Sequence, residues 1–154
     1  FSFTADHSGF YFAATRSSDP KWNGAGVEEL YFFSLASMGY QKVDLQWAWG
    51  IGGGYDVVGN DVIVSLANGA VNNLAFYQKN GNAWQKSPID LGAMNDHVSI
   101  SAVADPADKL LFIHSTAMQL PKLYVADLQV NSGKTAFNNA KELVKLNEGL
   151  AKKP

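Results

Sequence analysis

The sequence contains no cysteine, which excludes disulfide bonds, thiolate metal ligands and a cysteine nucleophile. Charge is also scarce, because charged residues make up 17% of the 154 residues and the formal net charge is −2. This balance gives no indication of a nucleic acid or an anionic membrane as partner. No apolar run approaches the roughly 20 residues of a membrane-spanning helix, and the first residues lack the basic and apolar regions of a signal peptide.

Neither end of the chain has the features of a natural terminus. The chain opens at Phe1 inside a strand-like segment without an initiating methionine, so we expect a fragment of a longer polypeptide. Residues 148–154 have the composition of a linker. No targeting segment fixes the compartment. The absence of cysteine does not fix the compartment either, because many exported bacterial proteins also lack it. The location is left open, with a periplasmic or secreted one slightly favoured over a cytoplasmic one.

The residues that are abundant point to an all-β protein. Apolar residues make up 47% of the chain, which is enough for a packed core in one domain. Aromatic residues reach 12%, and the chain has 14 glycines and 5 prolines. Aromatic strands separated by glycine-rich turns are typical of all-β folds.

Three apolar segments recur in a set order along the chain. They are "GFYFAATR" from Gly9, "DVIVSLAN" from Asp61 and "KLLFIHST" from Lys109. Each is followed by a second apolar run, namely "ELYFFSL", "NNLAFYQ" and "KLYVADL". A period of about 40–50 residues with about four short strands is typical of propeller blades. The sequence therefore predicts a β-propeller fragment of three four-stranded blades.

The repeat divides the chain into approximate blades at 1–45, 46–95 and 96–147. In the first blade, strands are expected at Glu28–Leu35 and Gln41–Leu45. Residues 140–147 fit either a short amphipathic helix or a last strand, and periodicity does not decide between them.

The third blade has the most distinct strand pattern. His97–Val103 alternates polar and apolar residues, as a half-buried strand does. Pro121 is expected to open the third strand, where a missing N–H costs no ladder hydrogen bond. The apolar face of that strand is predicted to carry Leu123, Val125 and Leu128.

No motif in the sequence indicates catalysis or metal binding. The Gly-x-Ser-x-Gly turn of a serine hydrolase is absent, and His7, His97 and His114 are too scattered to argue for a triad. Asp96 and His97 could bind a metal ion, but adjacent residues of a strand point to opposite faces. We therefore assign no catalytic, cofactor-binding or metal-binding residue.

Two glycine motifs imitate nucleotide-binding loops. Gly50–Gly54 resembles a dinucleotide fingerprint, but Tyr55 replaces its third glycine and no helix pattern follows. We interpret Gly50–Gly54 as a flexible inter-blade loop beside Trp47 and Trp49. Ser132–Thr135 imitates the end of a phosphate-binding loop, but Leu128 replaces the required glycine, so a turn is expected.

The four tryptophans allow two interpretations. Flat indole rings could form a platform for sugars, or they could pack between blades, which is the commoner use in a repeated sheet. Exposed tryptophans along one concave face would favour sugar binding, and buried tryptophans would favour the propeller. The tryptophans concerned are Trp22, Trp47, Trp49 and Trp84.

The segment "VSISAVADPADKLLFIHSTAMQLPKLYVADL", Val98 to Leu128, resembles the last propeller blade of prolyl oligopeptidase family serine peptidases. The dipeptidyl-peptidase and acylaminoacyl-peptidase branch is the most similar. Ser115, Pro121 and the "LYVADL" strand fit the family pattern. Asp108-Lys109 stands where the family usually has Asp-Gly-Lys, so the glycine of that turn is missing. In the segment that follows the blade, Val144 stands where the family usually has a threonine. The segment "TADHSGFYFAA" resembles the hairpin of an earlier blade.

This resemblance implies a non-catalytic propeller part of a serine exopeptidase. Such a part gates and positions short peptides for an α/β-hydrolase domain of the same polypeptide, which the chain itself does not contain. None of the family's triad residues maps to this chain. Its acidic motif for the substrate N-terminus does not map to Glu28 and Glu29, for which we expect a solvated strand end.

Two further expectations concern partners. Three blades cannot close a ring, so self-association through open propeller edges is possible. The alternative function is a free-standing β-rich module that binds carbohydrate or protein.

Overall fold

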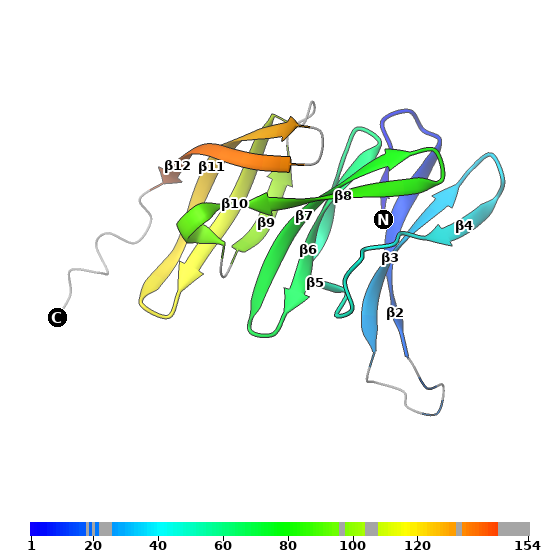
Figure 1. Cartoon of the computed structure of the whole chain (residues 1–154), viewed down its shortest axis with the longest axis horizontal. Helices are drawn as coiled ribbons and strands as arrows, with labels where there is room; N and C mark the ends of the chain where they lie inside the picture. Colours follow the sequence, from blue (N-terminus) through cyan, green and yellow to red (C-terminus); the bar gives the residue numbers. More distant parts are fainter. Residues whose placement is uncertain are drawn as a thin grey trace.

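The computed structural model describes residues 1–17, 19, 21, 26–95, 98–103, 108–131 and 134–144. These residues form three four-stranded antiparallel sheets that follow one another along the molecule (Figure 1). Within each sheet, neighbouring strands are consecutive in sequence, as in the blade of a β-propeller. The prediction of an all-β, propeller-like fold of three four-stranded blades is confirmed.

The strands group as follows. The first sheet contains β1 (Ser2–Phe3), β2 (Gly9–Arg16), β3 (Val27–Ser34) and β4 (Gly39–Lys42). The second sheet contains β5 (Ile51–Val58), β6 (Asp61–Asn68), β7 (Val71–Asn80) and β8 (Ala83–Asp90). A single turn of 3₁₀ helix, Gly92–Met94, follows β8. The third sheet contains β9 (Val98–Val103), β10 (Lys109–Thr116), β11 (Gln119–Asn131) and β12 (Lys134–Val144).

The sequence repeat corresponds to a repeated packing unit. The three segments that define it form the second strand of each sheet, β2, β6 and β10, and the runs that follow form the third strands. The first strands also meet, because β5 contacts both β1 and β9. In a propeller, the first strands of the blades line the central axis in this way.

The end of the described chain is a strand. Residues 140–144 belong to β12, which pairs with β11, so the strand interpretation holds for this part of 140–147. Residues 145–147 and the predicted linker at 148–154 lie outside the described residues.

Two predictions of strand ends are wrong. The segment Gln41–Leu45 is strand only as far as Lys42, and Leu45 is buried in the connection to the second sheet. Pro121 does not open its strand, because β11 begins at Gln119. Pro121 instead lies where the register between β10 and β11 shifts, between the pairs His114–Lys122 and Thr116–Gln119, so its missing N–H interrupts neither pair.

The predicted apolar face of β11 is also wrong in part. Leu128 is buried in the core as expected, but Ala126 is buried there with it and Tyr124 packs against the same layer. Residues two apart in a strand share a face, so Leu123 and Val125 lie on the opposite side. The predicted set had combined residues from both faces.

The glycine-rich segment Gly50–Gly54 is not the flexible inter-blade loop that we expected. Residues 51–54 belong to β5, whose register with β6 shifts between Ile51 and Gly54. A Cβ atom on Gly52 would lie 2.3 Å from the Asn72 Oδ1 atom and 2.7 Å from the Ala67 Cα atom. Glycine is required here because neighbouring backbone comes closer than a side chain allows.

Two apolar layers hold the three sheets together. Between the first and second sheets, the buried Trp84 indole donates a hydrogen bond to the Tyr11 hydroxyl at 3.0 Å. That hydroxyl donates to the Asn60 carbonyl at 2.8 Å, so the polar atoms of both rings are satisfied. The second layer joins the second and third sheets and includes Phe76 and Phe112. Trp84 therefore has the blade-packing role.

We predict that Gly52→Val lowers the free energy of unfolding by about 1–3 kcal/mol, the range for overpacking in a closely packed site. Chemical denaturation followed by tryptophan fluorescence measures the change. Gly39→Ala is the matched control, because a Cβ at Gly39 has no neighbour closer than 3.6 Å. Equal stability of the Gly52 variant and the parent chain would contradict the close approach at β5.

Candidate functional site

A pocket of about 270 Å³ opens where β8 separates from β7. The pairing between these strands ends at Ala75 and Pro88. Beyond Pro88, residues Ile89 and Asp90 pair in parallel with β12 of the third sheet instead. Proline has no N–H to donate to a ladder, so it is suited to the point where pairing stops. The separation leaves a hollow between β7 and the end of β8.

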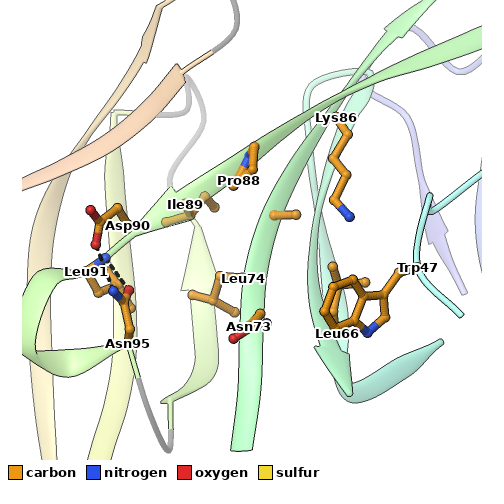
Figure 2. Close-up of a pocket in the computed structure, with 11 residues that line it drawn as sticks. Trp47, Leu66, Asn73, Leu74, Lys86, Pro88, Ile89, Asp90, Leu91 and Asn95 are labelled. Carbon is orange, nitrogen blue, oxygen red and sulfur yellow. Dashed lines mark hydrogen bonds between the residues drawn. The ribbon is translucent and has the colours of Figure 1, made fainter. Parts of the chain in front are cut away.

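The two ends of the pocket carry opposite charges. Figure 2 shows Lys86 and Trp47 at one end, Asp90 and Asn95 at the other, and Leu74 between them. The walls are otherwise mostly apolar, with Leu66, Ala75, Pro88, Ile89 and Leu91. This combination of an apolar hollow with a few polar groups is the usual form of a small-ligand site.

The cationic end is held by the connection between the first two sheets. Lys86 Nζ donates a hydrogen bond to the Gln46 carbonyl at 3.1 Å and lies 5.1 Å from the centre of the Trp47 ring. The Trp47 indole is fixed by its own hydrogen bond to the Ala67 carbonyl. Burial lowers the pKa of Lys86, and the nearby Asp44 opposes that effect. An anionic ligand group beside Lys86 would favour its charged form.

The anionic end is a compact turn. Asp90 Oδ1 accepts hydrogen bonds from the Asn95 side chain at 2.7 Å and from the Gly92 N–H at 2.8 Å. Asn95 Oδ1 in turn accepts a bond from the Leu91 N–H at 2.6 Å. The bonds from Asn95 and Gly92 lower the pKa of Asp90 below its ordinary value. The turn thus presents an exposed carboxylate that is fixed in orientation.

One wall of the pocket is the edge of β7. Leu74 and Asn73 pair with β6 on one side. On the other side, the described register gives them no partner in β8, because β8 has already turned toward β12. An unpaired strand edge is a site at which an extended peptide can add main-chain hydrogen bonds.

Two other hollows are less suited to a ligand with both charges. One, of about 380 Å³, lies between the first two sheets beside Tyr40 and Lys79, and the Lys79 ammonium already lies 4.3 Å from the centre of the Phe32 ring. The other, of about 290 Å³, lies against Trp47 and Trp49. Trp49 is 58% exposed, and its ring stands at 82° to that of Trp47, so the two rings form no flat platform.

The structure separates the histidines that it describes. His7 is exposed in the turn of the first sheet, and His114 is buried in β10 of the third sheet. Within the described ranges, no three His, Cys, Asp or Glu side chains come together as metal ligands would. The possible metal pair Asp96 and His97 lies outside those ranges, as do Trp22 and the first two residues of Ser132–Thr135.

The expectation of a solvated strand end is wrong for Glu29. Glu28 is exposed, but Glu29 is buried, and its carboxylate contacts Lys42 Nζ at 2.6 Å and Arg16 Nη1 at 3.6 Å. Its other oxygen accepts a hydrogen bond from the Tyr31 hydroxyl at 3.1 Å. The cause is pairing with β4, which brings Lys42 opposite Tyr31 and within reach of Glu29.

Sequence reasoning missed Lys86, Asp90 and Asn95. The one local signal was Pro88 within an alternating strand, which marks a point where a ladder can end. The strand that β8 joins lies more than forty residues further along the chain, so the pocket had no local signature.

Comparison with family models, curated proteins and solved structures found no match for this chain. Among the described residues, no helix is long and apolar enough to cross a membrane. The resemblance to the prolyl oligopeptidase family therefore stays a prediction that rests on the quoted segments alone.

The Glu29 carboxylate gives a prediction of pH dependence. Burial opposes its ionisation, but the bonds from Lys42 and Tyr31 and the nearby cations outweigh burial, so the pKa of Glu29 lies below its ordinary value. A carboxylate with a lowered folded-state pKa stabilises the fold above its unfolded pKa, and this is lost as the pH falls through the folded pKa.

We therefore expect Glu29→Gln to lower the free energy of unfolding by about 1 kcal/mol at pH 7. As the pH falls below the unfolded-state pKa of about 4.3 and through the lower folded-state pKa, the difference from the parent chain should shrink, because the parent's carboxylate gains its proton over that range. Urea unfolding at pH 7, 5 and 3.5 measures the difference in the free energy of unfolding between the variant and the parent chain. The exposed neighbour variant Glu28→Gln is the control, and a difference that does not depend on pH would contradict the ionic role.

Proposed function

We propose that this chain is the non-catalytic propeller part of a serine exopeptidase. It gates and positions short peptides for an α/β-hydrolase domain of the same polypeptide. The peptidase assignment rests on the resemblance of Val98–Leu128 to the last blade of that family. The observation that carries the peptide-binding part is the pocket between β7 and β8, with a cation at one end and a carboxylate at the other.

A short peptide with free termini fits the charges of this pocket. Its carboxylate would meet the Lys86 ammonium, and its ammonium would meet the Asp90 carboxylate. Lys86 and Asp90 are four residues apart in β8, which corresponds to roughly 13 Å in an extended strand. That distance is roughly the span of three or four extended peptide residues.

The strand edge supports an extended pose for the peptide. The main chain at Asn73 and Leu74 has no partner in β8 in the described register, so a bound peptide can pair with β7 there. The Trp47 ring and Leu66 give the pocket an apolar wall for a small side chain. The pocket does no chemistry in this proposal, because its role is to hold and orient the substrate.

A second candidate function is carbohydrate binding. The exposed ring of Trp49, beside a hollow of about 290 Å³, is the observation that favours it. The peptide proposal is preferred because the buried Trp84 serves sheet packing and the rings of Trp47 and Trp49 are nearly perpendicular. Glycan-array binding that Trp49→Ala abolishes would favour the carbohydrate function.

The pocket is tested with trialanine as the ligand. We expect trialanine with free termini to bind to the chain in the millimolar range and to shift the backbone amide NMR signals of Asn73, Leu74 and Asp90. Lys86→Met should weaken binding by about tenfold, since a hydrogen bond to a charged group contributes ~1.5 kcal/mol. The control is Lys21→Met, which removes an exposed lysine outside the pocket.

The effects of Lys86→Met on binding and on folding can be separated. Because burial lowers the pKa of Lys86, removal of its charge is not expected to lower the thermal midpoint. N-acetyl-trialanine amide, which lacks both terminal charges, should not bind. Equal binding of the blocked and free peptides would contradict the charge-based role of the pocket.

The peptidase assignment is tested on the full product of the gene. A fluorophosphonate probe should label the full product but not this chain, and only the full product should cleave dipeptidyl or acyl-aminoacyl chromogenic amides. If the full product is neither labelled nor active, the peptidase assignment fails and the binding-module alternative takes its place. The trialanine result is independent of that outcome.

A further inference from the structure

Seven aromatic side chains cover the face of the first sheet that points away from the second sheet. We call this the outer aromatic face, and its members are Phe1, Phe3, Phe10, Phe12, Tyr31, Phe33 and Tyr40. Phe1 is 84% exposed and Tyr40 is 69% exposed. No member of this face belongs to either core layer of the described residues. An apolar patch of this kind on a protein surface usually marks an interface.

The strand register shows which positions of the other two sheets are equivalent to this face. In the first sheet, Phe10 pairs with Phe33 and Phe12 pairs with Tyr31. Counted from the start of each second strand, the same positions in the second sheet are the pairs Val62–Tyr77 and Val64–Ala75. In the third sheet they are the pairs Leu110–Ala126 and Phe112–Tyr124.

In the second and third sheets, these positions pack on the preceding sheet. Val62, Val64 and Tyr77 lie in the layer shared with the first sheet. Leu110 and Phe112 lie in the layer shared with the second sheet. Phe10, Phe12, Tyr31 and Phe33 therefore occupy the positions by which a sheet of this chain packs on the sheet before it.

The third sheet has the opposite half of such an interface. The first sheet packs on the second with the side chains of Tyr11, Ala13, Leu30 and Phe32. The second sheet packs on the third with those of Ile63, Leu74 and Phe76. The equivalent paired positions of the third sheet are Leu111–Val125 and Ile113–Leu123. All four are aliphatic, and Ile113 is 37% exposed. We call them the outer aliphatic face.

We propose that the outer aliphatic face of one chain packs on the outer aromatic face of a second copy. The chain already makes this type of interface twice within itself, and the two sheet faces that no other described sheet covers are the two complementary halves of a third. A second copy has both faces, so it can cover the aromatic face and the aliphatic face of the first copy at the same time. Two copies then form a closed ring of six sheets, within the roughly four to eight blades of known propellers.

The charged groups at these faces are compatible with burial. Glu29, on the same face as Tyr31, is already paired with Lys42 and Arg16. On the outer aliphatic face, Lys109 is paired with Asp127. Lys141 also lies on this face, because it pairs with Val125, and it is exposed. Arg16, Lys42 and Lys141 have long side chains that can keep their charged ends in water at the border of the contact. Closure also removes the exposed sheet faces that an open array of blades leaves.

Sedimentation velocity on the chain at increasing concentration tests the proposal. We expect a closed species of twice the 16.7 kDa chain mass, with no larger assemblies. Phe12→Glu on the aromatic face and Ile113→Glu on the aliphatic face should each abolish the dimer. The control is Met118→Glu, which changes a 98% exposed side chain in a turn away from both faces and should leave the dimer intact.

A mixture of the two face variants distinguishes this interface from other dimers. A dimer of two copies has two contacts between an aromatic and an aliphatic face. In a dimer of one variant, both contacts contain the substitution. In a mixed dimer, one contact contains both substitutions and the other contains none. Mixing should therefore restore association in part. Circular dichroism checks that each variant is folded, and a folded variant that stays monomeric alone and dimerises in the mixture supports the proposal.

Three results would overturn it. They are a chain that stays monomeric at every concentration, a dimer that tolerates Ile113→Glu while Phe12→Glu abolishes it, and folded variants that fail to associate on mixing. The second result would mean that two aromatic faces contact each other. The proposal does not rest on the proposed peptide function, because trialanine binding is measured at a pocket whose lining includes no residue of either face.

Discussion

Each sheet of this chain has two apolar faces, and every other feature depends on how those faces are covered. Side chains alternate between the faces of a strand, so a run such as Val62–Leu66 sends apolar groups to both sides. Tyr11 and Trp84 illustrate the result, because they meet between two sheets and satisfy each other's polar atoms. Only the second sheet is packed on both faces by other described sheets.

The pocket is a local consequence of the same packing. The end of β8 contributes Ile89 to the layer between the second and third sheets, and there it pairs with β12 rather than with β7. Pro88 ends the original ladder, and the space that opens is bounded by a strand edge and by two fixed charges. The change of strand partner that joins two sheets thus also creates a hollow whose ends carry a lysine and an aspartate.

Strand positions were predictable where alternation and spacing act locally. The segments from Gly9, Asp61 and Lys109 became equivalent strands, because each combines β-forming residues with turn residues at both ends. Prediction failed where a distant partner decides. The sequence places Gly52 in a loop, whereas in the structure Asn72 and Ala67 pack closely against it. The sequence predicts a solvated Glu29, whereas in the structure Glu29 is paired with Lys42.

The sequence by itself determined the all-β class, the three repeated units and the absence of thiol chemistry, because composition and short-range periodicity specify them. The tertiary structure alone decided which face of β11 is buried, where β8 changes partner, and which sheet faces no other described sheet covers. Those outcomes depend on contacts between residues tens of positions apart. Register shifts, such as that beside Pro121, also move side chains without any change in local pattern.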